Sequence, residues 1–198
     1  VTNPPLDAIR EELVTSLITP LGTEENLFKE TPEHCGQLRL EQPILTDEEL
    51  ARMRELKMDR LRTVTLPMLF SVGDDGMGLE RGIGELCEAA TKAVAAGATI
   101  LILSDREASK EAVPIPALLA TAAVHHDLIR RGLRTRCGLV VESGEVREVH
   151  HVSLLLGYGA GAINPYLALA TVESLSQQNM LTDVDTQTAL KNYVKAIS

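Results

Sequence analysis

The feature that most constrains this chain is a fourfold alternation of a short strand-like run with a helix-length segment. The strand-like runs lie at 62–66, 99–103, 137–141 and 160–163. The run at 99–103 is almost wholly aliphatic and does not alternate, which is typical of a parallel strand covered on both faces. Successive strand–helix units predict a parallel sheet with right-handed crossovers. An open doubly wound sheet and part of a β/α barrel both satisfy this pattern.

The segments between the runs predict the helices of the core. Helical spacing extends over Leu79–Ala96 and Pro116–Arg131, and a third helix is expected to open at residues 142–144. Residues 67–78 are expected to form a Gly/Asp-rich connection. The glycines expected to cap the first two helices in the left-handed conformation are Gly97 and Gly132. The strand residues expected to be buried are Leu101, Leu103, Leu139 and Val141.

The first quarter of the chain reads as a helical and loop arm without a clear core of its own. An amphipathic helix is expected from about Asp7 to Ile18, ended by Pro20. Thr31-Pro32 favours a second helix start, and residues 46–49 form a capping box. The resulting segments are an arm at 1–56, a βα core at 57–175 and a C-terminal helix within 176–198.

Composition narrows the class of protein. The 198 residues are 44% hydrophobic, which favours one folded globular domain. The formal charge of −9 is spread along the chain, and this does not make the basic surface that nucleic acids require. No run approaches the ~18 apolar residues of a membrane helix, and the N-terminus does not resemble a signal peptide. We therefore expect no nucleic acid or membrane partner and a cytoplasmic location. The missing initiating Met, and a helical pattern still running at Ser198, suggest a piece of a longer chain.

The cysteines, histidines and clustered glycines are the obvious candidates for a metal or cofactor site. The three cysteines lack metal-type spacing and are expected to be reduced and buried. Each of the two His-His pairs points its rings about 100° apart on a helix, without a third ligand one turn away. The glycines at 157, 159 and 161 follow a helix and precede a strand, which is the reverse of a dinucleotide-binding turn. We expect no metal and no cofactor to be bound by this chain. The cysteines are Cys35, Cys87 and Cys137, and the paired histidines are His125, His126, His150 and His151.

Polar residues gather where the predicted strands end, which is the face that carries the chemistry of barrel enzymes. In a complete enzyme they would mark an active site. The alternative is structural: Asp105 pairs with Arg106, Ser143 caps its helix, and Asn164-Pro165 starts the next one. The second interpretation is favoured because no nucleophile–base spacing stands out. The residues concerned are Ser104, Asp105, Arg106, Glu142, Ser143, Asn164 and Tyr166.

Several stretches closely resemble the central domain of the large chain of glutamate synthase. The most specific covers residues 150–169, from His-His-Val-Ser-Leu-Leu-Leu-Gly-Tyr-Gly to Asn-Pro-Tyr-Leu-Ala. Others are Asn-Pro-Pro-Leu-Asp-Ala-Ile-Arg-Glu at 3–11, Thr-Pro-Glu-His at 31–34 and Leu-Ile-Leu-Ser-Asp-Arg at 101–106. The sequence of these stretches is more similar to the bacterial NADPH-dependent branch than to the ferredoxin-dependent one. The resemblance implies an incomplete, rudimentary version of a TIM barrel.

The resemblance also implies a role. The parent enzyme would hydrolyse glutamine, pass ammonia internally to 2-oxoglutarate and reduce the product to glutamate with electrons from FMN. Its FMN, iron–sulfur cluster and NADPH would be bound elsewhere, with a small NADPH-oxidising subunit as a possible partner. This piece would link the amidotransferase and FMN domains and help to enclose the ammonia passage, without catalytic residues of its own. The isolated piece is expected to be inactive.

The predicted lining of that passage, or of the domain interface, combines the strand-end residues with an N-terminal segment. The Pro-Pro pair could hold polar groups rigidly at a domain seam, although Asp7 could equally be only a helix cap. The residues of this segment are Asn3, Leu6, Asp7, Arg10 and Glu11. Two alternatives remain: a free-standing small β/α enzyme or binding domain for an anionic metabolite at the strand ends, and a pure oligomerisation module.

Overall fold

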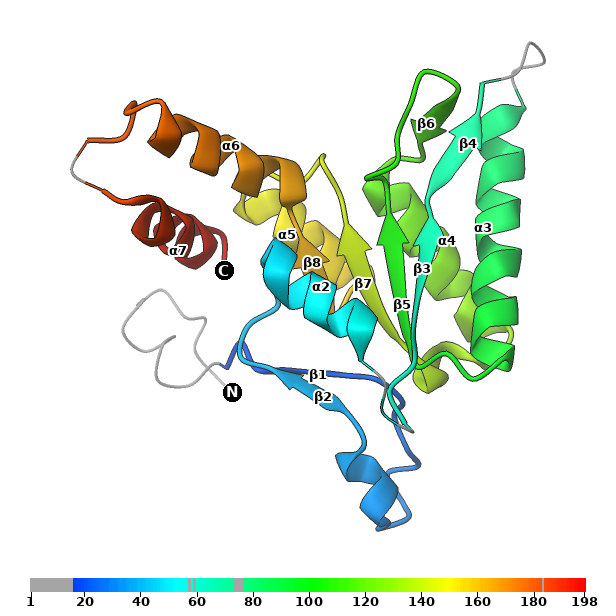
Figure 1. Cartoon of the computed structure of the whole chain (residues 1–198). Helices are drawn as coiled ribbons and strands as arrows, with labels where there is room; N and C mark the ends of the chain where they lie inside the picture. The colour runs from blue at the N-terminus through cyan, green and yellow to red at the C-terminus, as the bar shows by residue number, and fades with distance from the viewer. Residues whose placement is uncertain (1–15, 57, 59, 73–76, 183) are drawn as a thin grey trace, which may run out of the picture.

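A four-stranded parallel sheet lies at the centre of the molecule, in the strand order β3-β5-β7-β8 (Figure 1). The computed structural model describes residues 16–56, 58, 60–72, 77–182 and 184–198. The strands are β3 (Thr63–Pro67), β5 (Ile100–Ser104), β7 (Gly138–Glu142) and β8 (Ala162–Asn164). All three pairings are parallel, as predicted. The four residues expected to be buried, Leu101, Leu103, Leu139 and Val141, are each 0% exposed.

Three crossover helices cover one face of this sheet. They are α3 (Gly78–Ala95), α4 (Ala117–Arg130) and α5 (Val149–Gly157), and they share one apolar cluster with Leu101, Leu139 and the other outward-facing strand residues. A sheet whose strands follow in sequence order, with its crossover helices on one face, is wound as in a β/α barrel. A doubly wound sheet would place helices on both faces. The expected incomplete barrel is therefore confirmed; within the described residues the sheet does not close.

The C-terminal caps of α3 and α4 agree with the sequence prediction, but the start of α5 does not. Gly97 and Gly132 have φ angles of +90° and +68°, so both terminate their helices in the left-handed region. The third helix does not open at Glu142-Ser143-Gly144 as expected. It begins at Val149 after Glu148, because Ser143 and Gly144 form a turn that binds Asp105 instead.

The arm covers the opposite face of the sheet, which would be the lumen of a complete barrel. Helix α2 (Asp47–Glu55) begins with the predicted capping box, in which Thr46 and Glu49 bind each other's backbone N–H. An antiparallel hairpin of β1 (Thr19–Leu21) and β2 (Leu38–Leu40) lies beneath it and was not predicted. The apolar side chains that fill this face form a second cluster: Leu21, Leu45, Leu50, Met53, Leu61, Ile100, Ile102, Val140 and Ala162.

Several other predictions for the arm differ from the structure. Residues 16–18 are not helical, and Pro20 lies inside β1; the rest of the helix expected at 7–18 falls outside the described residues. Thr31-Pro32 does precede a helix, but only the short 3-10 helix η1 (Pro32–Cys35), and the Thr31 side chain makes no cap hydrogen bond. Cys35 is exposed, contrary to expectation, whereas Cys87 and Cys137 are buried thiols as expected.

The connection expected at 67–78 contains a short strand, β4 (Leu69–Ser71), paired with β6 (Ala112–Pro114). Phe70 of β4 packs closely on α3, since a Cβ at Gly82 would lie 2.5 Å from the Phe70 Cβ. Helices α6 (Tyr166–Gln177) and α7 (Thr186–Ile197) then form a hairpin beside β8 (Figure 1). A single 3-10 turn, η2 (Arg134–Arg136), precedes β7. None of the helices described is long and apolar enough to span a membrane.

Candidate functional site

The three strands β5, β7 and β8 end in a row of buried polar side chains. Ser104 pairs in register with Glu142, and Glu142 with Asn164. Their exposed fractions are 6%, 0% and 0%. Because side chains alternate along a strand, all three share the face of Ile102, and therefore point toward α2.

Glu142 is the charged centre of this row. One carboxylate oxygen accepts hydrogen bonds from Ser104 Oγ and from Arg54 Nη2 of α2. The other, Oε1, lies 2.9 Å from Arg106 Nε as an ion pair, without the alignment of a hydrogen bond. A buried carboxylate is tolerated only when paired and hydrogen-bonded. Arg54 and Arg106 therefore make the burial of Glu142 possible.

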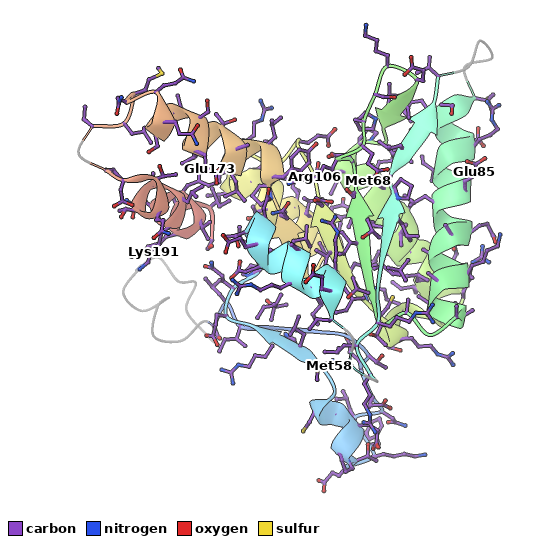
Figure 2. All side chains as sticks on the ribbon, viewed as in Figure 1. Met58, Met68, Glu85, Arg106, Glu173 and Lys191 are labelled. Carbon is purple, nitrogen blue, oxygen red and sulfur yellow. The ribbon has the colours of Figure 1, made fainter. Side chains whose placement is uncertain are left out.

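Arg106 joins four parts of the fold, and Figure 2 labels it where the strands end. Besides Glu142, its guanidinium binds Asp47 at the start of α2, with Nη2 to Oδ2 at 2.7 Å. Its carbon Cζ lies 4.5 Å from the centroid of the Tyr166 ring at the start of α6. Burial lowers the pKa of Arg106, but Asp47 and Glu142 outweigh that effect and raise it overall.

Asp105 does not pair with Arg106, so that part of the structural interpretation is wrong. Its carboxylate instead accepts from Ser143 Oγ at 2.6 Å and from the Gly144 N–H at 3.0 Å. Ser143 in turn accepts from the Glu145 N–H at 3.1 Å, and does not cap α5. Burial, together with the neighbouring Asp105 carboxylate, raises the pKa of Tyr166 to about 12. The Tyr166 hydroxyl is therefore protonated at neutral pH.

Asn164 fastens the last strand to the arm. Its Nδ2 donates to the Leu45 carbonyl and to Asp47 Oδ1, both at 2.9 Å. Helix α6 begins directly after Asn164-Pro165, as predicted. The structure thus brings together all seven strand-end residues predicted from the sequence. The predicted residues Asn3, Leu6, Asp7, Arg10 and Glu11 lie outside the described residues.

Two members of the network were missed from the sequence. Asp47 was interpreted only as part of a capping box, and Arg54 only as a residue of the arm. Neither has a local signal, because each reaches the strand ends from a helix far away in the sequence. Arg54 and Glu142 are 88 positions apart. A carboxylate buried at a strand end needs a cation beside it. That requirement is the signal that could have pointed to an arginine of the arm as a partner of Glu142.

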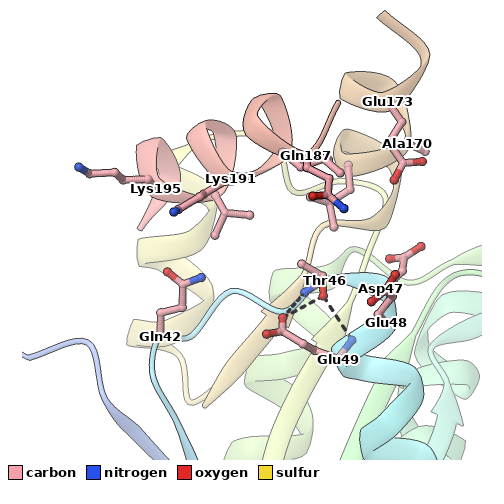
Figure 3. A pocket seen from close by; sticks show the side chains of 13 residues that line it. Gln42, Thr46, Asp47, Glu48, Glu49, Ala170, Glu173, Gln187, Lys191 and Lys195 are labelled. Atoms are coloured by element: carbon pink, nitrogen blue, oxygen red, sulfur yellow. Dashed lines mark hydrogen bonds between the residues drawn. The ribbon is translucent and has the colours of Figure 1, made fainter. Parts of the chain in front are cut away.

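Two hollows adjoin the network. One, of about 380 Å³, is lined by Arg54, Thr65, Pro67, Ser104, Arg106, Glu107 and Glu142. Both of its arginines already face carboxylates. The Ser104 hydroxyl donates to Glu142, but that carboxylate is ion-paired with both arginines. The other is a groove of about 560 Å³ between α2 and the α6–α7 hairpin (Figure 3). Its apolar lining comes from Leu169, Leu190 and Val194, whereas Glu173 and Lys191 add opposite charges.

The histidines take part in structural contacts. His125 Nδ1 accepts a hydrogen bond from Arg134 Nε at 2.9 Å, and the same guanidinium donates to the carbonyls of Cys137 and Gly159. His151 Nδ1 accepts from the Arg147 N–H at 3.1 Å. Among the residues that the structure describes, no three His, Cys, Asp or Glu side chains are placed to hold one metal ion.

Fold and site together define an incomplete β/α barrel domain whose lumen face is filled by its own N-terminal arm. The family "Glutamate synthase central domain" matches residues 1–198. The chain therefore belongs to the glutamate synthase central domain family.

Relatives with this domain occur in several kinds of glutamate synthase. The chain is 43% identical to the NADPH glutamate synthase large chain of Bacillus subtilis and 40% identical to the NADH glutamate synthase of Schizosaccharomyces pombe. It is 38% identical to the ferredoxin-dependent glutamate synthase of Pyropia yezoensis. Each match covers 100% of this chain but only 13%, 10% and 13% of those relatives. The chain thus spans only about a tenth of the length of these relatives.

Two solved structures of flavocytochrome b2 variants align weakly with this chain. A flavocytochrome b2 variant with benzoylformate aligns with a TM-score of 0.49 and 16% identity, over 76% of this chain and 32% of that chain. A second variant, with sulfite, aligns with a TM-score of 0.47 and 18% identity, over 79% and 34%.

Proposed function

We propose that this chain is the inter-domain region of a cytoplasmic glutamate synthase, linking its amidotransferase and FMN domains and helping to enclose the ammonia passage. The observation that carries the proposal is the family match over residues 1–198. The matched region makes up 13% and 10% of the length of the first two relatives. The parent enzyme would convert glutamine, 2-oxoglutarate, two electrons and two protons into two molecules of glutamate.

The geometry of the strand ends supports a structural rather than a catalytic role. In a barrel enzyme this edge would be open to substrate. Here the carboxylates of Glu142 and Asp105 bind Arg54, Arg106 and Ser143 instead. The same contacts give little support to binding of an anionic metabolite, because both guanidiniums of the adjacent hollow are already paired with carboxylates.

The described residues of this chain do not fit the cofactors of the parent enzyme. The Gly144 N–H, at the turn after β7, donates to Asp105 and so is not free to bind a phosphate. Cys87 and Cys137 are buried, Cys35 is exposed on the arm, and no group of metal ligands forms among the described residues. We place FMN and the iron–sulfur cluster on other domains, and NADPH on a small partner subunit. The electron donors named among the relatives differ, which is consistent with a donor chosen elsewhere.

An isotope experiment on the full-length enzyme tests this proposal. Glutamine labelled with ¹⁵N at the amide is supplied with 2-oxoglutarate, the enzyme's electron donor and an excess of unlabelled ammonium. We expect half of the glutamate formed to carry ¹⁵N in its amino group, undiluted by the external ammonium. Absence of glutamine-dependent glutamate formation would refute the assignment to glutamate synthase. Dilution of the label would refute an enclosed passage.

A further inference from the structure

Two adjacent apolar side chains on the arm are almost completely exposed. Leu27 is 90% exposed and Phe28 is 97% exposed, whereas the next most exposed large apolar side chain described, Val72, is 64% exposed. The chain contains only two phenylalanines and no tryptophan. Single exposed aliphatic residues are ordinary, but a neighbouring leucine and phenylalanine both left in solvent suggest a contact surface.

The loop that carries these side chains is held in place by the body of the domain. The Glu24 N–H donates to the Thr135 carbonyl at 2.7 Å, and Thr23 Oγ1 donates to the Arg136 carbonyl at 2.9 Å. A turn at Asn26 then fixes the tip, since Asn26 Oδ1 accepts from the Phe28 N–H at 3.0 Å. The tip is therefore preorganised, which lowers the entropic cost of docking.

The far side of the tip is also tied down. His34 Nε2 donates to the Lys29 carbonyl at 2.7 Å, and Glu33 forms an ion pair with Arg60 at 3.2 Å. The tip projects from the end of the sheet opposite the strand-end network (Figure 1). The tip is thus a projection whose conformation is fixed by these contacts, and it is separate from the strand-end network.

The surroundings of the tip define the chemistry of its partner. Residues 23–33 contain four glutamates and one lysine, so the apolar pair stands in an acidic setting. A partner that fits would present an apolar pocket with cationic side chains at its rim. A second copy of this chain fits poorly, because its net charge of −9 opposes self-association. The groove between α2 and the α6–α7 hairpin would also repel the tip, because its four carboxylates outnumber its two lysines.

We propose that Leu27 and Phe28 form a docking tip that enters an apolar, cation-rimmed pocket on another domain of the same parent polypeptide. The inference rests on the proposed function only in requiring a parent with further domains. That requirement agrees with the chain spanning 10–13% of its relatives. The tip would fix the orientation of the incomplete barrel at the end away from the strand-end network.

Cysteine accessibility in the full-length enzyme tests this docking. In a Cys35→Ser background, Phe28→Cys is treated with a maleimide, and labelling of its peptide is followed by mass spectrometry. The reference is the same peptide in denatured enzyme. We expect labelling in the folded enzyme to be slower by about tenfold or more, as for a buried side chain. A matched variant, Met180→Cys at a 63% exposed residue on the α6–α7 connection, reports on general access.

A photo-crosslinking benzoylphenylalanine at position 28 identifies the occupant. We expect a crosslink to a peptide of another domain within the same polypeptide. Labelling of Phe28→Cys at the denatured rate would overturn the proposal, and so would crosslinks between two copies. Neither readout depends on turnover. An enzyme that fails the isotope test but protects position 28 would therefore contradict the proposed function and leave the docking tip intact.

Discussion

Cζ of the Arg106 guanidinium lies 4.5 Å from the centroid of the Tyr166 ring, while its Nε and Nη2 atoms face Glu142 and Asp47. One residue following β5 thus holds β7, the start of α2 and the start of α6 together. The arrangement explains how an arm that precedes the sheet in sequence stays packed against its strand ends. It also singles out Arg106 as the residue whose loss should loosen the site most.

Replacing Arg106 by alanine should destabilise the domain by about 1–3 kcal/mol, because buried Glu142 would keep only Arg54 as a cation. Arg106→Lys retains the charge but loses the planar stack on Tyr166 and the forked donors, so it should recover only part of this loss. Arg52→Ala is the control. Its ion pair with Glu48 is highly exposed, and its loss should cost about 0–0.5 kcal/mol. Urea unfolding measures all three, and equal effects of Arg106→Ala and Arg52→Ala would contradict the network.

Asp105 and Ser143 should be energetically coupled. Asp105→Asn removes a charged acceptor from a side chain that is 2% exposed, and should cost about 1–3 kcal/mol. Ser143→Ala removes the donor 2.6 Å away. In a double-mutant cycle, the combined variant should lose about 1 kcal/mol less than the sum of the two single losses. Strict additivity would show that this hydrogen bond contributes nothing.

Gly159 and Gly157 offer a matched pair of glycine substitutions. Gly159 has a φ of +107°, and a Cβ there would lie 2.1 Å from His125 Nδ1. Gly159→Ala should therefore cost about 2–4 kcal/mol. At Gly157 a Cβ would meet nothing within 4 Å, and Gly157→Ala should be neutral or stabilising by up to about 1 kcal/mol. Thermal or urea unfolding separates the two; similar losses at both positions would rule out the steric cause.

His125 should make the domain acid-sensitive. Burial, then Arg134 and then His126, lower the pKa of His125 below its ordinary value of 6.5. The unfolded chain therefore binds a proton more readily than the folded one, and stability rises with pH across this window. This contribution is complete above pH 6.5 and is lost as pH falls toward the lower folded pKa. Measured between pH 8 and pH 5, His125→Gln should flatten the fall in unfolding free energy; an unchanged slope would contradict the assignment.

The sheet was predictable because its signal is local. Four short strand-like runs, each followed by a helical pattern, predict parallel strands, and the unalternating aliphatic run at 99–103 is the strongest of them. Gly97 and Gly132 end two of the helices in the left-handed conformation. The seven strand-end residues could likewise be predicted as neighbours, because the carboxyl ends of parallel strands meet at one edge.

What the sequence did not predict depends on contacts between distant residues. Strands β1, β2, β4 and β6 are three residues long each, too short for periodicity to register. The start of α5 was misplaced because Asp105, from another strand, binds Ser143 and Gly144 and holds them out of the helix. The choice of Asp47 rather than Asp105 as the partner of Arg106 is likewise a tertiary outcome.

The measurement that tests the account most directly compares glutamine hydrolysed with glutamate formed in the full-length enzyme. The variants are Leu6→Trp and Asp7→Ala in the N-terminal segment proposed to border the ammonia passage, with Met180→Ser as a control at an exposed residue. We expect both segment variants to continue hydrolysing glutamine while glutamate formation falls and ammonia escapes to solvent, with the control unchanged. A normal ratio with no released ammonia for every substitution in the segment would contradict a role for this domain in enclosing the passage.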